Sequence, residues 1–238
     1  MVSLHERYPA MGLDGLYHSL KRNFICSRGR IHRLMKAHNI HSQRKRAYKA
    51  TTNSKHSYPV APNLFKRSFA ADRPNAVWVG DITYLPTDQG WLYLAIVKDL
   101  CSRKVVGYAF SDRIDARLTT QALEMAVRRE KPTENLVFHS DRGVQYASHT
   151  YRQDLERYSI RQSMSRKGDP YDNAVAENFF CSLKCELIYL RRFSTRDETQ
   201  AAVFAYIEAF YNRLRPHSGI GWLAPSDFTL SFLSNSAA

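Results

Sequence analysis

Short runs rich in β-branched and aromatic residues recur between residues 77 and 165. This composition is typical of β-strands, because branched and aromatic side chains fit a pleated, half-buried surface. Turn signals such as Asp88-Gln89-Gly90 separate the first three runs, which indicates hairpins. The pattern predicts five strands, at Val77–Leu85, Trp91–Leu100, Lys104–Ser111, Leu136–Asp141 and Arg161–Ser165.

Between and after the later strands, apolar residues recur every three or four positions, which places them on one face of a helix. The pattern predicts helices at Asp115–Glu130, at Tyr151–Tyr158, from about Asp172 onward and at Thr195–Leu214. Three antiparallel strands followed by helix, strand, helix, strand and helix predict an α/β fold. We therefore expect a five-stranded mixed sheet with helices on both faces.

The first 75 residues carry a weaker pattern. Leu13–Arg22 and Arg28–His38 are predicted to be short helices with a short joint, as in a helix-turn-helix. The following stretch contains several prolines and little apolar periodicity, which indicates a linker. Whether the helix pair reads DNA or only packs on the core stays open. The predicted domains are a small helical module at 1–40, a basic linker at 41–75, and a core with a C-terminal helix at 76–238.

The net charge of +13 comes from a single block of the chain. From Gly15 to Ala71 there are 13 Lys or Arg and no Asp or Glu, whereas the other residues include 22 of each sign. Such a block is expected of a protein that binds the phosphate backbone of nucleic acid. A solvated basic tail that serves solubility is the alternative. The candidate DNA-contacting residues in this block are Arg28, Arg30, Arg33, Arg44, Lys45, Arg46 and Lys49.

Membrane and secretion signals are missing from the pattern. The sequence has no run of about 18 apolar residues, and its N-terminus has no apolar signal-peptide core. The four cysteines do not form a disulfide framework in a chain of this length. We therefore expect a cytoplasmic protein with no membrane partner.

Three acidic residues stand where an ionised side chain needs a partner. Asp81 lies inside an apolar predicted strand, Asp141 ends another, and Glu177 lies on the helix from about Asp172. An ionised carboxylate in an apolar strand is costly unless it is paired or binds a cation. Carboxylate oxygens suit Mg²⁺ or Mn²⁺, and two such ions close together would serve phosphoryl transfer. Asp99 is assigned to a turn instead.

Lys184 follows Glu177 by seven residues, which is two helical turns, so the two side chains share a helix face. A carboxylate and an ammonium placed in this way, after a polar loop, suit the binding of a metal ion and a phosphate. A plain surface ion pair is the alternative for these two residues taken alone.

Three separated motifs, DITYL, HSDRG and GDPYDNAVAENFFCSLKCEL, resemble the bacterial insertion-sequence transposases related to retroviral integrases. In particular, they resemble the large insertion-sequence three family. The 35 residues between Asp141 and Glu177, and the basic Lys184 seven positions later, match that family's pattern. The segment FYNRLRPHSGIGWLAPSDF is similar to its C-terminal pattern. The resemblance covers about 76–228 strongly and the N-terminal part more loosely.

The resemblance implies a ribonuclease H-like fold, with the first strand central and the fourth strand beside it. In such a fold Asp81 and Asp141 are neighbours, and a helix brings Glu177 across to them. The implied activity is that of a DDE-type transposase, which cuts DNA at transposon ends and transfers the strand to target DNA. The implied cofactor is Mg²⁺ or Mn²⁺, two ions in each site, held by these three acids.

The resemblance also suggests roles for neighbouring residues. Lys184 would hold a phosphate near the cut, and Arg142 and Asn173 would contact DNA. Four residues flank the acids, and a structural role is open for each of them: His139, Arg142, Asn173 and Asn178.

The partners that the resemblance implies are double-stranded DNA and further copies of the chain assembled on DNA. In this family an upstream reading frame supplies a DNA-binding protein, which is a third expected partner. Two other functions stay open. One is a ribonuclease H-like nuclease that cuts but does not join, and the other is a transposase-derived DNA-binding regulator.

Overall fold

The five predicted strands are all present and form one mixed sheet with the order β3-β2-β1-β4-β5. Strand β1 pairs antiparallel with β2, which pairs antiparallel with β3, while β4 runs parallel to both β1 and β5. The first strand is therefore central and the fourth lies beside it, as expected. The strands are β1 (Val77–Thr87), β2 (Gly90–Asp99), β3 (Val105–Ser111), β4 (Val137–Ser140) and β5 (Arg161–Met164).

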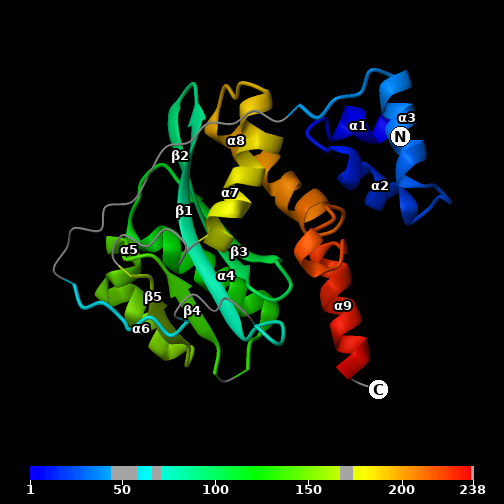
Figure 1. Cartoon of the computed structure of the whole chain (residues 1–238). Helices are drawn as coiled ribbons and strands as arrows, with labels where there is room; N and C mark the ends of the chain where they lie inside the picture. The colour runs from blue at the N-terminus through cyan, green and yellow to red at the C-terminus, as the bar shows by residue number, and fades with distance from the viewer. Residues whose placement is uncertain (44–57, 66–70, 134, 167–173, 237–238) are drawn as a thin grey trace. The chain divides into compact units, whose positions relative to one another are not determined.

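The computed structural model, drawn in Figure 1, describes residues 1–43, 58–65, 71–133, 135–166 and 174–236. Two compact units make up the chain. The sheet unit consists of Lys49–Phe180 and Phe193–Gln200, and the helical unit combines Met1–Tyr48, Cys181–Arg192 and Ala201–Ala238.

One face of the sheet carries the larger apolar core. Helices α4 (Ala116–Glu130), α5 (Val144–Ala147) and α6 (His149–Arg157) bury their apolar residues in the same core as Trp78 and Phe138 of the sheet. Helix α4 begins at the N-cap Asp115, whose side chain accepts a hydrogen bond from the amide of Leu118.

Close packing in this core requires a glycine in the central strand. A Cβ atom at Gly80 would collide with the ring of Phe138, which is fully buried. A side chain at position 80 would not fit, because β1 packs very closely against the ring of Phe138 there.

The opposite face is covered by the start of helix α7 (Ala174–Glu186). Ala176 is buried there with Val77, Val79 and Leu100, and Phe65 packs against this cluster. This face also carries buried charged residues, because Asp81 and Lys98 project from it. The predicted helix from about Asp172 is thus present from Ala174, and Asp172 lies outside the described residues.

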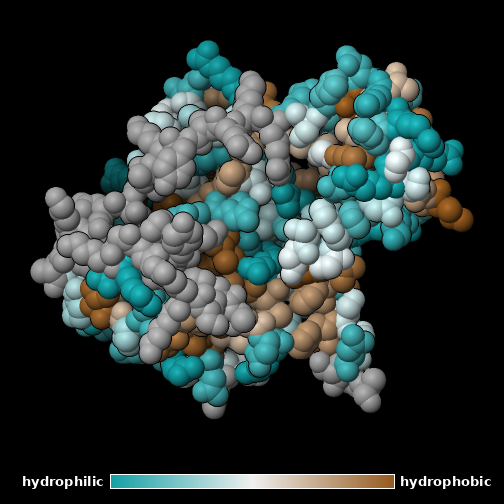
Figure 2. All heavy atoms as spheres, viewed as in Figure 1, coloured by the Kyte–Doolittle hydropathy of each residue, from teal (hydrophilic) through white to brown (hydrophobic). Residues whose placement is uncertain are grey.

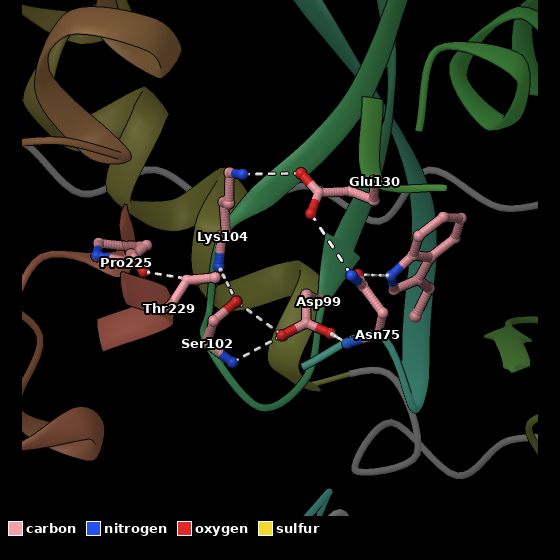
Figure 3. Close-up of polar contacts among 8 residues, drawn as sticks. Asn75, Asp99, Ser102, Lys104, Glu130, Pro225 and Thr229 are labelled. Atoms are coloured by element: carbon pink, nitrogen blue, oxygen red, sulfur yellow. Dashed lines mark hydrogen bonds and ion pairs between the residues drawn. The ribbon is translucent and has the colours of Figure 1, made fainter. Parts of the chain in front are cut away.

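A cluster of polar side chains lies at the end of the sheet where β1 begins, as Figure 3 shows. Asp99, which is 1% exposed, accepts bonds from the amide and the hydroxyl of Ser102 at 2.7 and 2.6 Å. Its other oxygen accepts from the amide of Asn75 at 2.7 Å. The turn role predicted for Asp99 is confirmed, because these bonds hold the β2–β3 turn and the start of β1 together.

The same cluster also binds Glu130, the last residue of α4. The side chain of Asn75 accepts from the indole of Trp78 at 2.9 Å and donates to Glu130 at 3.4 Å. Lys104 pairs with Glu130 at 2.7 Å. We name the set Asn75, Asp99, Ser102, Lys104 and Glu130 the base cluster.

The helical unit contains the two predicted N-terminal helices, now α2 (Leu13–Lys21) and α3 (Arg28–Ala37), preceded by α1 (Val2–Arg7). The predicted helix Thr195–Leu214 is present as α8 (Arg196–Ala205), which continues into the π-helical segment η3 (Tyr206–Tyr211). Short 3-10 turns at Ile188–Leu190 and Ser218–Ile220 and helix α9 (Pro225–Ser236) complete the unit.

Residues far apart in the sequence meet in this unit. Tyr8 stacks on Phe210 with ring centroids 4.0 Å apart, and His18 stacks on Trp222 at 4.2 Å. Such contacts group the two ends of the chain, whereas the sequence divided it into 1–40, 41–75 and 76–238. The roles assigned to those three segments stay a prediction.

Arg215 fastens the end of α7 to the segment after η3. Its guanidinium donates to both carboxylate oxygens of Glu186, at 2.9 and 2.7 Å, and Glu186 also accepts from the hydroxyl of Tyr206 at 2.8 Å. This bidentate pair gives Arg215 a structural role. Among the described residues, no helix is both long enough and apolar enough to cross a membrane.

Candidate active site

Asp81 lies in the middle of β1 with its side chain 7% exposed. Because side chains alternate along a strand, Asp81 projects to the same face as Val77 and Val79, which is the face that α7 covers. One carboxylate oxygen accepts a hydrogen bond from the amide of Ile82 at 2.8 Å. A buried carboxylate on this face is therefore held in a defined orientation.

Asp141 comes directly after β4, and the strand register sets it beside Asp81. Val79 pairs with His139 and Gly80 with Ser140, so Asp81 and Asp141 are the next residues on two parallel neighbours. Asp141 is half-buried and accepts a bond from the amide of Gly143 at 2.9 Å. The neighbourhood of the two acids that the family fold implied is present.

Glu177 lies on the first turns of α7, directly after the buried Ala176. Glu177 is exposed, yet partial loss of solvation raises the pKa of its carboxyl group, and the nearby charge of Asp141 raises the pKa further. Two carboxylates that disfavour each other's ionisation are close enough to interact electrostatically. Glu177 is therefore near enough to Asp141 for the two charges to interact, and its place in one site with Asp81 and Asp141 stays a prediction.

Tyr146 of α5 lies in the core, and the same acids affect the pKa of its phenol. Burial is the main reason that its phenol pKa is well above the usual value, and the charges of Tyr151, Asp81 and Asp141 add to the effect. Asp81 and Asp141 thus both disfavour a further negative charge at Tyr146. Clustered negative charges attract cations.

The donor set fits a hard divalent cation, since all three candidates present carboxylate oxygens. Among the described residues, no three His, Cys, Asp or Glu side chains are already arranged closely enough to hold a metal ion. Asp81 and Asp141 are adjacent through the sheet, and Glu177 approaches from a helix.

His139 lies two residues before Asp141, is fully buried, and connects strands of the sheet through hydrogen bonds. Its Nδ1 lies 2.8 Å from the hydroxyl of Ser163 and its Nε2 lies 3.2 Å from that of Ser165. Ser165 also donates to the carbonyl of Ser140, and the amide of Leu64 donates to Ser163. The imidazole links β4 to β5 just before Asp141.

Arg142 follows Asp141 and is partly engaged in the fold. Its Nε donates to the carbonyl of Ser165 at 2.7 Å, which joins the ends of β4 and β5. Its predicted contact with DNA stays a prediction.

The other predicted site residues lie elsewhere. Lys184 is half-buried on α7 in the helical unit, while Glu177 belongs to the sheet unit. Arg28, Arg30 and Arg33 are exposed on α3, and Arg28 pairs with Asp14 at 2.6 Å. Asn178 is exposed on α7. Asn173, Arg44, Lys45, Arg46 and Lys49 lie outside the described residues.

Sequence reasoning missed one buried cation on the acidic face, Lys98. It is 4% exposed, and its Nζ donates to the carbonyl of Val175 at 3.1 Å. The available signal was a lysine within AIVKDL, an otherwise apolar strand with one acid at its end.

Figure 2 shows hydrophilic and hydrophobic surface intermixed on the visible face.

Two matches to protein families cover the region that carries these acids. Residues 71–170 match the family described as integrase core domain, and residues 158–225 match a second family with the same description. Asp81 and Asp141 lie within the first match and Glu177 within the second.

Close relatives come from bacterial insertion sequences. The chain is 46% identical over 208 residues to an uncharacterized 31 kDa protein of insertion element IS600 from Shigella sonnei, covering 87% of this chain and 76% of that protein. It is 47% identical over 189 residues to the transposase InsF for insertion sequence IS3A from Escherichia coli, covering 79% of this chain. The match spans 66% of that transposase, slightly under two thirds of its length.

A solved structure shares the fold. The catalytic core domain of BIV integrase aligns with 69% of this chain and 99% of its own length, with a TM-score of 0.51 and 16% identity. The ribonuclease H-like sheet expected from the motifs is thereby confirmed.

Proposed function

This chain belongs to the insertion-sequence transposases with an integrase core domain, and on that premise we propose how its acidic site works. Asp81, Asp141 and Glu177 form one site that cuts DNA at the ends of a transposon and joins the freed strand to target DNA. The observation that carries this proposal is the parallel register of β1 and β4, which sets Asp81 beside Asp141. The raised pKa of Glu177, caused by burial and then by Asp141, adds the third acid.

The three carboxylates would hold divalent cations, Mg²⁺ or Mn²⁺, as two ions in each site. When bound, these ions supply charge neutralisation at the phosphate and lower the pKa of the attacking water or hydroxyl. Asp81 and Asp141 provide a rigid pair of ligands, because each is fixed by a backbone amide. Glu177 completes the set from a helix and orients the site toward the DNA.

Phosphoryl transfer needs little covalent chemistry from protein side chains, so positioning and charge carry the catalysis. Lys184 would contact a phosphate of the bound strand. Arg142 would contribute charge next to Asp141 while its Nε holds the carbonyl of Ser165. Asn173 would contact DNA from the segment before α7.

The partner of the basic block is double-stranded DNA, both transposon ends and target. Phosphate contacts would come from Arg30 and Arg33 on the exposed side of α3, and from the segment that contains Arg44, Lys45, Arg46 and Lys49. Arg28 contributes less, because Asp14 already pairs with it. Two transposon ends require at least two copies of the chain, so we expect a homo-oligomer on DNA in the bacterial cytoplasm.

The relatives suggest one further partner. In this family an upstream reading frame supplies a DNA-binding protein, and sequence-specific recognition of the ends would also use that protein. The isolated chain should then bind transposon ends weakly and with little preference over other DNA.

The experiment is a strand-transfer assay with Mg²⁺, using labelled duplexes that end in the termini of the element that encodes this chain. The wild-type chain, alone and with the upstream-frame protein, should nick the ends and join them to a plasmid target. The Asp141→Asn variant should bind the same DNA and do neither. Cutting without joining would favour a plain nuclease, and binding without cutting would favour a regulator.

A further inference from the structure

Lys98 projects to the same face of the sheet as the acids. On β2 it pairs with Val79 of β1, while Ile96, two residues earlier, pairs with Asp81. Side chains two positions apart on a strand share a face, so Lys98 and Asp81 are diagonal neighbours on adjacent strands. A lysine side chain is long enough to bridge such a diagonal.

The strand is irregular at this residue. The pairing of β2 with β3 shifts register between Val97 and Lys98, which marks a β-bulge. Bulges re-aim a side chain and are common next to active sites.

The ammonium group of Lys98 reaches the first turn of α7. Its Nζ donates to the carbonyl of Val175 at 3.1 Å, two residues before Glu177. The adjacent Ala176 is buried against Val77, Val79 and Leu100, so this turn of the helix sits directly on the sheet. Lys98 therefore adds a polar fastening to an apolar contact that involves only a few small side chains.

Stabilisation of the fold does not by itself explain why a charged lysine is buried at this position. Removing an ammonium from water costs several kcal/mol unless its partners are well placed, and an apolar residue of similar size is often neutral or better. The residues two positions away on either side, Ile96 of β2 and Leu100 directly after it, are apolar and buried. A methionine or leucine at this position would pack well in the sheet. The presence of a lysine therefore indicates a role at the acidic site.

We propose that Lys98 is a positioning residue that fastens the first turn of α7 to β2 and so holds Glu177 near Asp81 and Asp141. The inference rests on the proposed function of those three acids. The charge of Lys98 also offsets the repulsion between the carboxylates on this face before divalent ions bind.

The test compares Lys98→Met, Lys98→Arg and the matched control Lys104→Met. Lys104 is another partly buried lysine, but it pairs with Glu130 in the base cluster. Two readouts are used: hydrogen exchange of peptides that cover α7, and strand transfer by the full chain with Mg²⁺. DNA affinity is measured alongside with a labelled duplex of mixed sequence.

We expect Lys98→Met to exchange faster in α7 only, to bind DNA as well as the wild type, and to join strands about 100-fold more slowly, because small displacements of a catalytic group are costly. Lys98→Arg keeps a donor and should recover most of the protection in α7. Lys104→Met should match the wild type in both readouts.

Wild-type exchange in α7 together with wild-type joining in Lys98→Met would overturn the proposal. So would faster exchange throughout the sheet with an unchanged rate per folded molecule, because that result describes a merely structural lysine. If Lys98→Met does not fold, Lys98→Gln is tested by the same criteria. If the wild type itself joins no DNA, the proposed function fails, while the exchange data still decide whether Lys98 fastens α7.

Discussion

The sheet unit carries acids in two places, and their surroundings differ. In the base cluster the carboxylate of Asp99 accepts three hydrogen bonds, from Ser102 and Asn75, and Glu130 is paired with Lys104. At the end of β4 the acids face other acids, since the charge of Asp141 raises the pKa of Glu177. A carboxylate surrounded by donors stabilises a turn, whereas neighbouring carboxylates repel one another, and a nearby cation such as Lys98 or a divalent ion offsets that repulsion.

The comparison shows that burial does not identify a metal ligand. Asp99 is more deeply buried than Asp81, at 1% against 7% exposed, and burial raises its pKa. Hydrogen-bond donors from its own hairpin account for its position. What separates the two sites is the chemical type of the neighbouring groups.

The largest expected difference between the two sites is in catalysis. Asp81→Asn, Asp141→Asn and Glu177→Gln each remove one ligand charge and should lower both cleavage and joining by about 1,000-fold or more. Asp99→Asn should stay within a few fold of the wild type, because no metal contact is assigned to it. Nicking and strand-transfer rates with Mg²⁺ measure both sets. Normal joining by Glu177→Gln would exclude that residue from the site, and an equal loss at Asp99 would extend the site to the base cluster.

The second expected difference is in the response to metal. A ligand present at 100 times its dissociation constant stabilises the folded state by about 2.7 kcal/mol. Mg²⁺ at that excess should raise the Tm of the wild type and of Asp99→Asn alike, and the triad variants should respond little. Without metal, the triad variants should be as stable as the wild type or more so, because one of several repelling charges is gone. Thermal unfolding with Mg²⁺ and with EDTA decides this, and an equal metal response in Asp141→Asn would count against the assignment.

The third difference is in stability at the base cluster. Asp99→Asn turns an amide N–H toward the amide of Asn75, so that two donors face each other where a carboxylate now accepts. We expect a loss of about 1–3 kcal/mol in the free energy of unfolding. Asp81→Asn, which lacks this role in a turn, should lose less. Denaturant unfolding of both variants provides the comparison, and an equal loss would remove the distinction.

The loss of unfolding free energy in Asp99→Asn should depend on pH in a definite direction. Burial raises the pKa of Asp99 above its unfolded value, and the hydrogen bonds from Ser102 and Asn75 only partly oppose the rise. Its contribution to stability is therefore complete below the unfolded pKa and declines as pH rises through the folded pKa. The stability gap between wild type and Asp99→Asn should narrow from acid toward neutral pH. A gap that widens would mean that the folded carboxyl has a lowered pKa.

The smallest effect is expected at Glu130. Glu130→Gln removes the ion pair with Lys104 but keeps an acceptor for the amide of Asn75. The cost should be at most about 1 kcal/mol, as for partly exposed pairs. Because the charge of Glu130 raises the pKa of Asp99, the variant should also shift the pH-dependent narrowing to lower pH. An unchanged pH profile would show that the two carboxyl groups do not interact.

Much of the sheet could be predicted from the sequence, because the composition of a strand is a local property. All five strands and the helices at α2, α3, α4, α6, α7 and α8 followed from local patterns. Helices α1, α5 and α9 did not follow, since each is short or has an unclear apolar period. The grouping of the chain ends was also missed, because contacts such as Tyr8 with Phe210 join residues that no local pattern relates.

The acids Asp81, Asp141 and Glu177 could be selected from the sequence, since a carboxylate in or beside an apolar strand has a high cost and motif spacing supplied the order. The tertiary structure alone decided which acids meet. The register of β1 with β4 brings Asp81 to Asp141, and the hairpin turn assigns Asp99 to Ser102. It also placed Lys98 on the acidic face. The physical reason is that a charge acts through space on whatever the fold places nearby, and a sequence pattern records the residue without its neighbours.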